Sequence, residues 1–181
     1  MPHVDVLDST LHHVETGAGR PVVLLHGNPA SSYIWRQVLP EVGPGRLLAP
    51  DLIGMGASGK PNRDLRFADH ARYLDAWFDA LALDDVVLVG HDWGGALAFD
   101  WAARHPDRVA GLAFFESVVR PLADDEVSPR ALERTELVRS PVDGERFVLD
   151  TTDFVVSAFR GGVLTPVAEA DLAAYLSLIH I

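Results

Sequence analysis

A glycine-flanked carboxylate is the clearest candidate for chemistry in this sequence. Asp92 lies in the run Gly90-His91-Asp92-Trp93-Gly94, after the apolar segment 86–89 and before a helical pattern over 96–104. This spacing is typical of a nucleophile on a sharp strand-to-helix turn, where the flanking glycines avoid collisions with neighbouring backbone. The turn would place the nucleophile at the carboxyl end of its strand, where open α/β sheets bind ligands. Backbone N–H groups at the start of the following helix would favour negative charge there.

The residue type at this turn indicates which reaction it would perform. A serine that attacked a saturated carbon would form an ether, which water does not readily cleave. A carboxylate that did the same would form an ester, which an activated water can hydrolyse. Asp92 therefore predicts displacement at an alkyl carbon rather than acyl transfer. The alternative is that Asp92 only caps the following helix, a common role for aspartate.

Asn28 and Trp93 are the candidate donors to an anion beside this carboxylate. The run His26-Gly27-Asn28-Pro29 follows the apolar segment 21–25, at the position that supplies a second oxyanion donor in folds with such a turn. The amide of Asn28 and the indole of Trp93 both offer N–H groups, which suit a leaving anion without protons, such as a halide. The alternatives are an Asx-turn before Pro29 for Asn28 and core packing for Trp93.

A second carboxylate, Glu116, follows the predicted strand 109–115. It would therefore lie at the same edge of the sheet as Asp92. The functional interpretation is the acid that orients a catalytic histidine, and the alternative is a solvated glutamate at the end of a strand.

The histidines near these candidates are assigned other roles. His26 is expected to be structural, because it belongs to the His-Gly turn at a strand end. The side chain of His91 is expected to point away from the nucleophile that follows it. His70 and His105 are expected to lie on helix surfaces.

The elements that would position these residues alternate between two periods. Short apolar runs predict strands, and apolar residues three and four apart predict helices, which together indicate a parallel sheet flanked by helices. The predicted strands are 4–6, 11–15, 21–25, 47–49, 86–89 and 109–115, and the predicted helices begin near Asp69, with Leu74, Trp77, Phe78 and Leu81 on one face, and near Ala96. After residue 118 the sequence becomes charged, proline-containing and weakly helical, so a boundary is expected there.

Composition narrows the function classes. The chain has 181 residues, of which 48% are hydrophobic and 23% charged, enough for a packed core. A net charge of −11 argues against nucleic acid as a partner. The absence of cysteine excludes disulfides, thiol catalysis and cysteine-ligated metals. With no signal-like or membrane-spanning stretch, we expect a cytoplasmic protein without a membrane partner.

Taken together, these segments resemble haloalkane dehalogenases of the α/β-hydrolase fold. The resemblance rests chiefly on HGNPASSYIWRQVLP from His26, APDLIGMGASGKP from Ala49, RFADHARYLDAWFDAL from Arg66, VVLVGHDWGGALAF from Val86 and FFESVVRP from Phe114. It continues to Tyr175. The run GHDWG is shared with epoxide hydrolases, which usually carry an aromatic residue where Asn28 stands.

The resemblance implies a hydrolase that cleaves carbon–halogen bonds through an aspartyl-alkyl ester, releasing halide and alcohol. Asp92 would be the nucleophile, Asn28 and Trp93 would hold the halide, and Glu116 would be the acid of the subgroup that places it after the sixth strand. Phe154 would line the pocket from a partial helical cap over 119–181, and 1–118 would form the N-terminal part of the core. The partners would be a small apolar halogenated substrate, water and halide. No metal or cofactor is expected.

The end of the sequence differs from the family. Chains of the family continue through more of the cap, two further strands and the catalytic histidine. His180 is the only histidine after Glu116 and has no catalytic surroundings, and residues 176–181 lie outside the resemblance. We therefore expect a truncated form without the base histidine, and we interpret its last six residues as non-native sequence.

The residues leave three alternatives open, two of them enzymes. An epoxide hydrolase would use the same Asp92 but needs tyrosines in the cap, where Tyr175 alone occurs. A coelenterazine luciferase-like oxygenase is suggested by the runs YLDAWFDAL and ESVV. The third alternative is an inactive, aggregating fragment.

Overall fold

The structure is a computed structural model that describes residues 2–161 and 163–177. Its contacts divide the chain into one unit that ends at Val119 and a second that begins at Arg120. This division falls one residue after the boundary expected from the sequence. No helix in the described ranges has the length and apolar character needed to cross a membrane.

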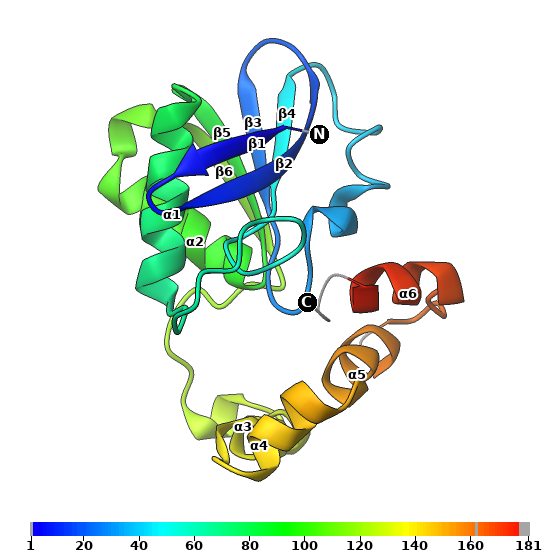
Figure 1. The fold of residues 1–181 in the computed structure, drawn as a ribbon. Coiled ribbons are helices and arrows are strands. Elements are labelled where there is room, and N and C mark those ends of the chain that lie inside the picture. The colour runs from blue at the N-terminus through cyan, green and yellow to red at the C-terminus, as the bar shows by residue number, and fades with distance from the viewer. Residues whose placement is uncertain (1, 162, 178–181) are drawn as a thin grey trace. The chain divides into compact units, whose positions relative to one another are not determined.

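The first unit is built on a six-stranded sheet with the order β1-β2-β4-β3-β5-β6 (Figure 1). Strands β4, β3, β5 and β6 are parallel, while β1 and β2 join them through antiparallel pairs. The mostly parallel sheet flanked by helices confirms the predicted fold class. The strands are β1 His3–Val6, β2 Ser9–Gly17, β3 Pro21–Leu25, β4 Arg46–Pro50, β5 Val86–His91 and β6 Val109–Phe115.

Two helices, α1 (Phe67–Ala80) and α2 (Trp93–Arg104), pack on one face of this sheet (Figure 1). The predicted apolar stripe of α1 is buried at Leu74, Trp77 and Phe78. Phe78 stacks on Trp101 of α2, with ring centroids 4.1 Å apart. This contact lies within the larger of two apolar cores, which also includes Val23, Leu25 and Leu88 of the sheet.

The opposite face of the sheet carries a smaller core of Leu24, Trp35, Leu47 and Ala49. Trp35 comes from a 3-10 helix, η1 (Ser32–Trp35), which the sequence analysis did not predict, and a second one, η2, spans Pro106–Arg108. At the edge of the sheet, β6 pairs with β5 alone among the described strands. Its last residues, Phe114 and Phe115, are about half exposed.

The second unit is helical. Its first long helix begins where Ser128 caps the chain by accepting the N–H of Ala131, with Pro129 in the first turn. Leu172 and Tyr175 are buried, and Tyr175 stacks on Phe159 at 3.8 Å. The elements are η3 Asp124–Glu126, α3 Pro129–Arg139, α4 Asp143–Glu145, the π-helical η4 Arg146–Asp150, α5 Asp153–Gly161 and α6 Glu169–Ser177.

The expected surface position of His70 is wrong, whereas the side chain of His105 remains partly exposed. His70 lies on the buried side of α1, where the side chain is shielded by the core, and its Nδ1 has no hydrogen-bond partner within the described residues. Burial lowers the pKa of His70. His105 ends α2 half-buried, with Nε2 3.3 Å from a carboxylate oxygen of Asp75. The sequence did not indicate the burial of His70, because a histidine counts as a polar residue in a helical pattern.

The buried His70 predicts a pH-dependent stability. In the unfolded chain a histidine takes up a proton below about pH 6.5. Because burial lowers the pKa of His70 in the folded state, the unfolded chain binds more protons as the pH falls below that value, and the free energy of unfolding decreases. We expect His70→Gln to make this decrease smaller between about pH 7 and about pH 5. Urea denaturation at both pH values measures it, and an unchanged decrease would contradict the prediction.

Candidate active site

Asp92 lies on the turn between β5 and α2, in a backbone conformation rare for residues with a side chain (φ 54°, ψ −124°). Its carboxylate makes no capping hydrogen bond to the helix. Instead, Oδ1 accepts the backbone N–H of Asn28 at 2.9 Å. The helix-cap alternative is therefore wrong, and the carboxylate is aimed at the carboxyl end of β3.

The glycines around Asp92 are required by close backbone contacts. A Cβ on Gly90 would lie 2.4 Å from the Cα of Gly95, and a Cβ on Gly94 would lie 2.1 Å from the carbonyl oxygen of Leu25. These contacts confirm the role predicted for the flanking glycines. Gly27 is needed for a related reason, because a Cβ there would lie 2.0 Å from Oδ1 of Asp92 itself.

The register of β5 and β6 brings the two candidate acids to corresponding positions. His91 pairs with Phe115, so Asp92 and Glu116 each lie one residue beyond the last pair. Glu116 also has a positive φ, 50°, and its side chain is exposed. The sheet therefore places both residues at the carboxyl ends of its parallel strands, as the sequence predicted.

Ser117 holds the turn that carries Glu116, and sequence reasoning missed it. Its hydroxyl donates to the carbonyl of Phe115 at 3.0 Å and lies 3.5 Å from the carbonyl of Gly90. A Cβ on Gly95 would lie 1.9 Å from the Ser117 hydroxyl oxygen, so this side chain fills the space beside the first turn of α2. The available signal was a small polar residue directly after the acid.

The two candidate anion donors flank Asp92 and are open to solvent. Asn28 is exposed, follows β3 and precedes a cis peptide bond to Pro29. Within the described residues its side chain makes no hydrogen bond, so the Asx-turn alternative is not observed. Trp93 is 44% exposed, so core packing is not its role. Its ring contacts that of Phe67, with centroids 5.8 Å apart.

The two neighbouring histidines take the places expected for them. His26 is fully buried, with Nδ1 2.8 Å from the carbonyl oxygen of Gly27, while Nε2 accepts the N–H of Leu52 at 2.9 Å. This pattern holds the neutral ring and joins the end of β3 to the loop after β4, and burial lowers the pKa of His26 accordingly. The ring of His91 stacks on Phe115 at 5.0 Å.

Asp51, just after β4, supports the loops beside the site and was missed as a functional neighbour. It is buried and accepts the N–H groups of Ser32 at 2.6 Å and Ala57 at 2.9 Å, while His12 Nδ1 lies 2.8 Å away. Burial raises the pKa of Asp51, but the donated hydrogen bonds outweigh it and hold the pKa below its usual value. The Pro50-Asp51 pair at a strand end was the available signal.

Phe154 belongs to the second unit and is described there alone. It lies in α5, half-buried, where its ring meets the ring of Phe147 edge-on at 6.0 Å and the guanidinium of Arg134 at 5.1 Å. These contacts explain how the ring is held. Its predicted role in lining the substrate pocket from the cap stays a prediction.

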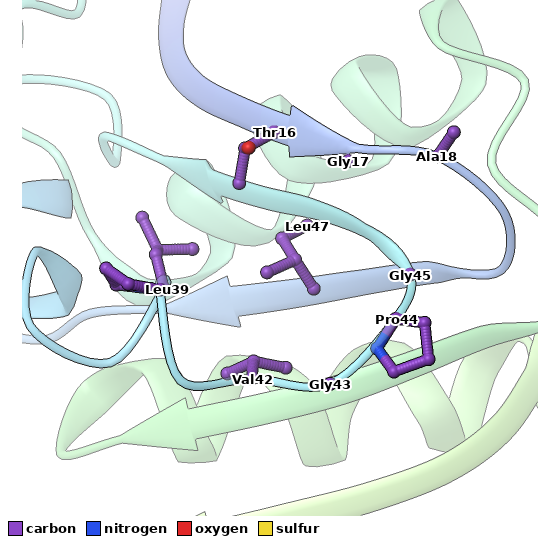
Figure 2. A pocket seen from close by; sticks show the side chains of 10 residues that line it. Thr16, Gly17, Ala18, Leu39, Val42, Gly43, Pro44, Gly45 and Leu47 are labelled. Atoms are coloured by element: carbon purple, nitrogen blue, oxygen red, sulfur yellow. The ribbon is translucent and has the colours of Figure 1, made fainter.

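A separate pocket of about 510 Å³ lies at the amino ends of β3 and β4 (Figure 2). Thr16, Leu39, Val42 and Leu47 line it together with several glycines and prolines. It contains no titratable side chain. It lies at the amino ends of the strands, whereas Asp92 lies at the carboxyl end of β5. In the part of the chain that the structure describes, no three histidine, aspartate or glutamate side chains are grouped to hold a metal ion.

Comparison with known proteins agrees with this architecture. The family model described as the alpha/beta hydrolase fold matches residues 20–161, and the chain belongs to this family. Within it, the chain is 50% identical over 177 residues to a haloalkane dehalogenase of Mesorhizobium japonicum, covering 95% of this chain and 57% of the relative. A haloalkane dehalogenase of Agrobacterium fabrum is 47% identical, with 91% of this chain and 55% of the relative covered.

Solved structures show the same likeness. The haloalkane dehalogenase DatA from Agrobacterium tumefaciens C58 matches with a TM-score of 0.92 and 44% identity over 97% of this chain and 61% of its own. DbeA from Bradyrhizobium elkani USDA94 matches with a TM-score of 0.93 and 46% identity, covering 97% and 62%. The chain thus spans little more than half the length of the curated relatives. These names do not favour the epoxide hydrolase or luciferase alternatives.

The contact of Gly94 with Leu25 predicts a specific sensitivity of the turn. Gly94→Ala forces a Cβ against a backbone carbonyl that cannot move without shifting β3, so we expect a loss of roughly 2 kcal/mol or more in the free energy of unfolding. Gly43→Ala is the matched control, because nothing lies within 4 Å of its added Cβ. Urea denaturation of both variants measures the difference, and equal stabilities would contradict it.

Proposed function

We propose that this protein displaces halide from alkyl halides, with Asp92 as the nucleophile. The observation that carries the proposal is the carboxylate of Asp92, which is held by the N–H of Asn28 and is not used as a helix cap. The similarity to enzymes named haloalkane dehalogenases supports the same reaction.

The hydrogen bond from Asn28 distinguishes the two oxygens of the nucleophile. Oδ1 is engaged by the backbone N–H at 2.9 Å, while Oδ2 has no hydrogen bond within the described residues. Oδ2 is therefore the attacking atom. It forms a bond to the carbon that carries the halogen, the carbon–halogen bond breaks, and the halide leaves with the bonding electrons. The product is an alkyl ester of Asp92.

The leaving halide needs donors in place of water. The indole N–H of Trp93 and the side-chain amide of Asn28 are proposed to supply them, since both residues adjoin the nucleophile and both side chains are exposed. Donors aimed where charge develops stabilise a transition state more than the ground state. Phe154 is proposed to line the apolar side of the substrate site.

Ester cleavage completes the proposed reaction. Water attacks the ester as a base removes its proton, the alcohol leaves, and the carboxylate of Asp92 is regenerated. Glu116 is proposed to orient the histidine that acts as this base, a role that we assign to none of the eight histidines in the sequence. His26 does not serve as that base, because its ring nitrogens are engaged by Gly27 and Leu52.

The role of Asp92 as nucleophile can be tested by following covalent modification or isotope incorporation at this residue. Incubation with 1-bromobutane in water enriched in ¹⁸O should leave either a butyl group or ¹⁸O on the Asp92 peptide, depending on whether the ester is hydrolysed. Peptide mass spectrometry reads both marks, and bromide is counted in parallel. Asp92→Ala should abolish bromide release, whereas His26→Ala should alter stability only. Bromide release without any mark on Asp92 would refute the assignment.

The halide donor can be tested separately from the nucleophile. Asn28→Ala removes the side-chain amide but keeps the backbone N–H that holds Asp92. We expect bromide release to slow by about 100-fold or more, since one such donor contributes on the order of 3 kcal/mol. His91→Ala, which removes a ring stacked on Phe115, should slow release much less. Equal effects of the two substitutions would show that Asn28 only shapes its turn.

A further inference from the structure

The ring of Phe67 is the only aromatic neighbour of Trp93 among the described residues, at 5.8 Å between centroids and 47° between planes. This separation lies within the range of favourable aromatic pairs. Trp93 otherwise extends from the first turn of α2 and remains 44% exposed. We propose that Phe67 is a positioning residue that holds the indole of Trp93 in the orientation that binds halide. The proposal rests on the proposed function above.

Phe67 is itself held firmly. It is the first residue of α1, is half-buried and packs against the larger core. The start of this helix is closed by Asp69, whose side chain accepts the N–H of Arg66 at 3.0 Å and whose own N–H donates to the Arg66 carbonyl at 2.9 Å. The core therefore holds the ring of Phe67 in place, and this ring is a fixed neighbour for the exposed ring of Trp93.

An unsupported indole at this position would sample several rotamers. The anion beside Asp92 can accept a hydrogen bond only when the indole N–H faces it, so each other rotamer reduces the fraction of protein ready to bind. A neighbour that disfavours those rotamers strengthens binding without contacting the halide. Loss of an aromatic pair of this kind corresponds to roughly a twofold to tenfold change in affinity.

The arrangement of tryptophans provides a direct readout. Trp35, Trp77 and Trp101 are buried, at 2%, 0% and 1% exposure, so halide quenching of tryptophan fluorescence reports on Trp93. In Phe67→Leu we expect the dissociation constant for bromide, taken from the saturable part of the quenching, to rise about twofold to tenfold. Phe67→Tyr should restore the wild-type value. Phe67→Met provides the same test if the leucine variant does not fold.

Phe99→Leu is the matched control. Phe99 also lies on α2 and forms an aromatic pair of similar geometry, with Phe114, at 4.9 Å and 62°. This substitution should lower the melting temperature and leave bromide affinity unchanged. If Phe67→Leu lowers the melting temperature but also leaves affinity unchanged, Phe67 is only a packing residue and the inference is wrong.

Failure of the proposed function would look different. In that case the wild-type protein would show no saturable bromide quenching, and Asn28→Ala would quench as the wild type does. Acrylamide, a neutral quencher, separates a change in exposure of Trp93 from a change in halide binding. A larger acrylamide effect in Phe67→Leu, together with weaker bromide binding, is the result that the positioning role predicts.

Discussion

The hydrogen bond from the Asn28 N–H to Oδ1 of Asp92 joins two turns that lie 64 positions apart in the chain. Asp92 accepts it from a backbone conformation with positive φ, which costs about 1–3 kcal/mol and persists where the surroundings determine it. Those surroundings are backbone atoms of β3 and of α2, which approach so closely that Gly90 and Gly94 have no room for a side chain. The carboxylate is thereby kept from capping the helix and remains available for chemistry.

The neighbouring turns are held by the same kind of contact. Glu116 adopts a positive φ at the end of β6, and the Ser117 hydroxyl bonds across it to the carbonyl of Phe115. After β4, the carboxylate of Asp51 accepts the backbone N–H groups of Ser32 and Ala57. In each case a polar side chain satisfies a backbone group that has no partner within a strand or helix. These bonds order the loops at the carboxyl ends of the parallel strands.

The apolar core supplies the rigidity that these turns need. Aromatic contacts join α1 to α2 through Phe78 and Trp101, and α2 begins at the residue directly after the nucleophile. A displacement of α2 would therefore move Asp92 relative to Asn28. Phe67 extends the same support outward to Trp93, so the proposed halide donor is connected to the core although its ring is open to solvent.

The sequence by itself determined the strands 21–25 and 109–115, the apolar face of α1 and the glycine-flanked turn at Asp92, because these features follow from local periodicity and local sterics. It also determined that Asp92 and Glu116 share one edge, since both follow parallel strands. The tertiary structure decided the rest. The contact of Asn28 with Asp92 and that of Phe67 with Trp93 join distant segments, so they depend on strand order and helix packing. His70 was misplaced on the surface because its burial comes from the packing of α1, which a polar residue type does not reveal.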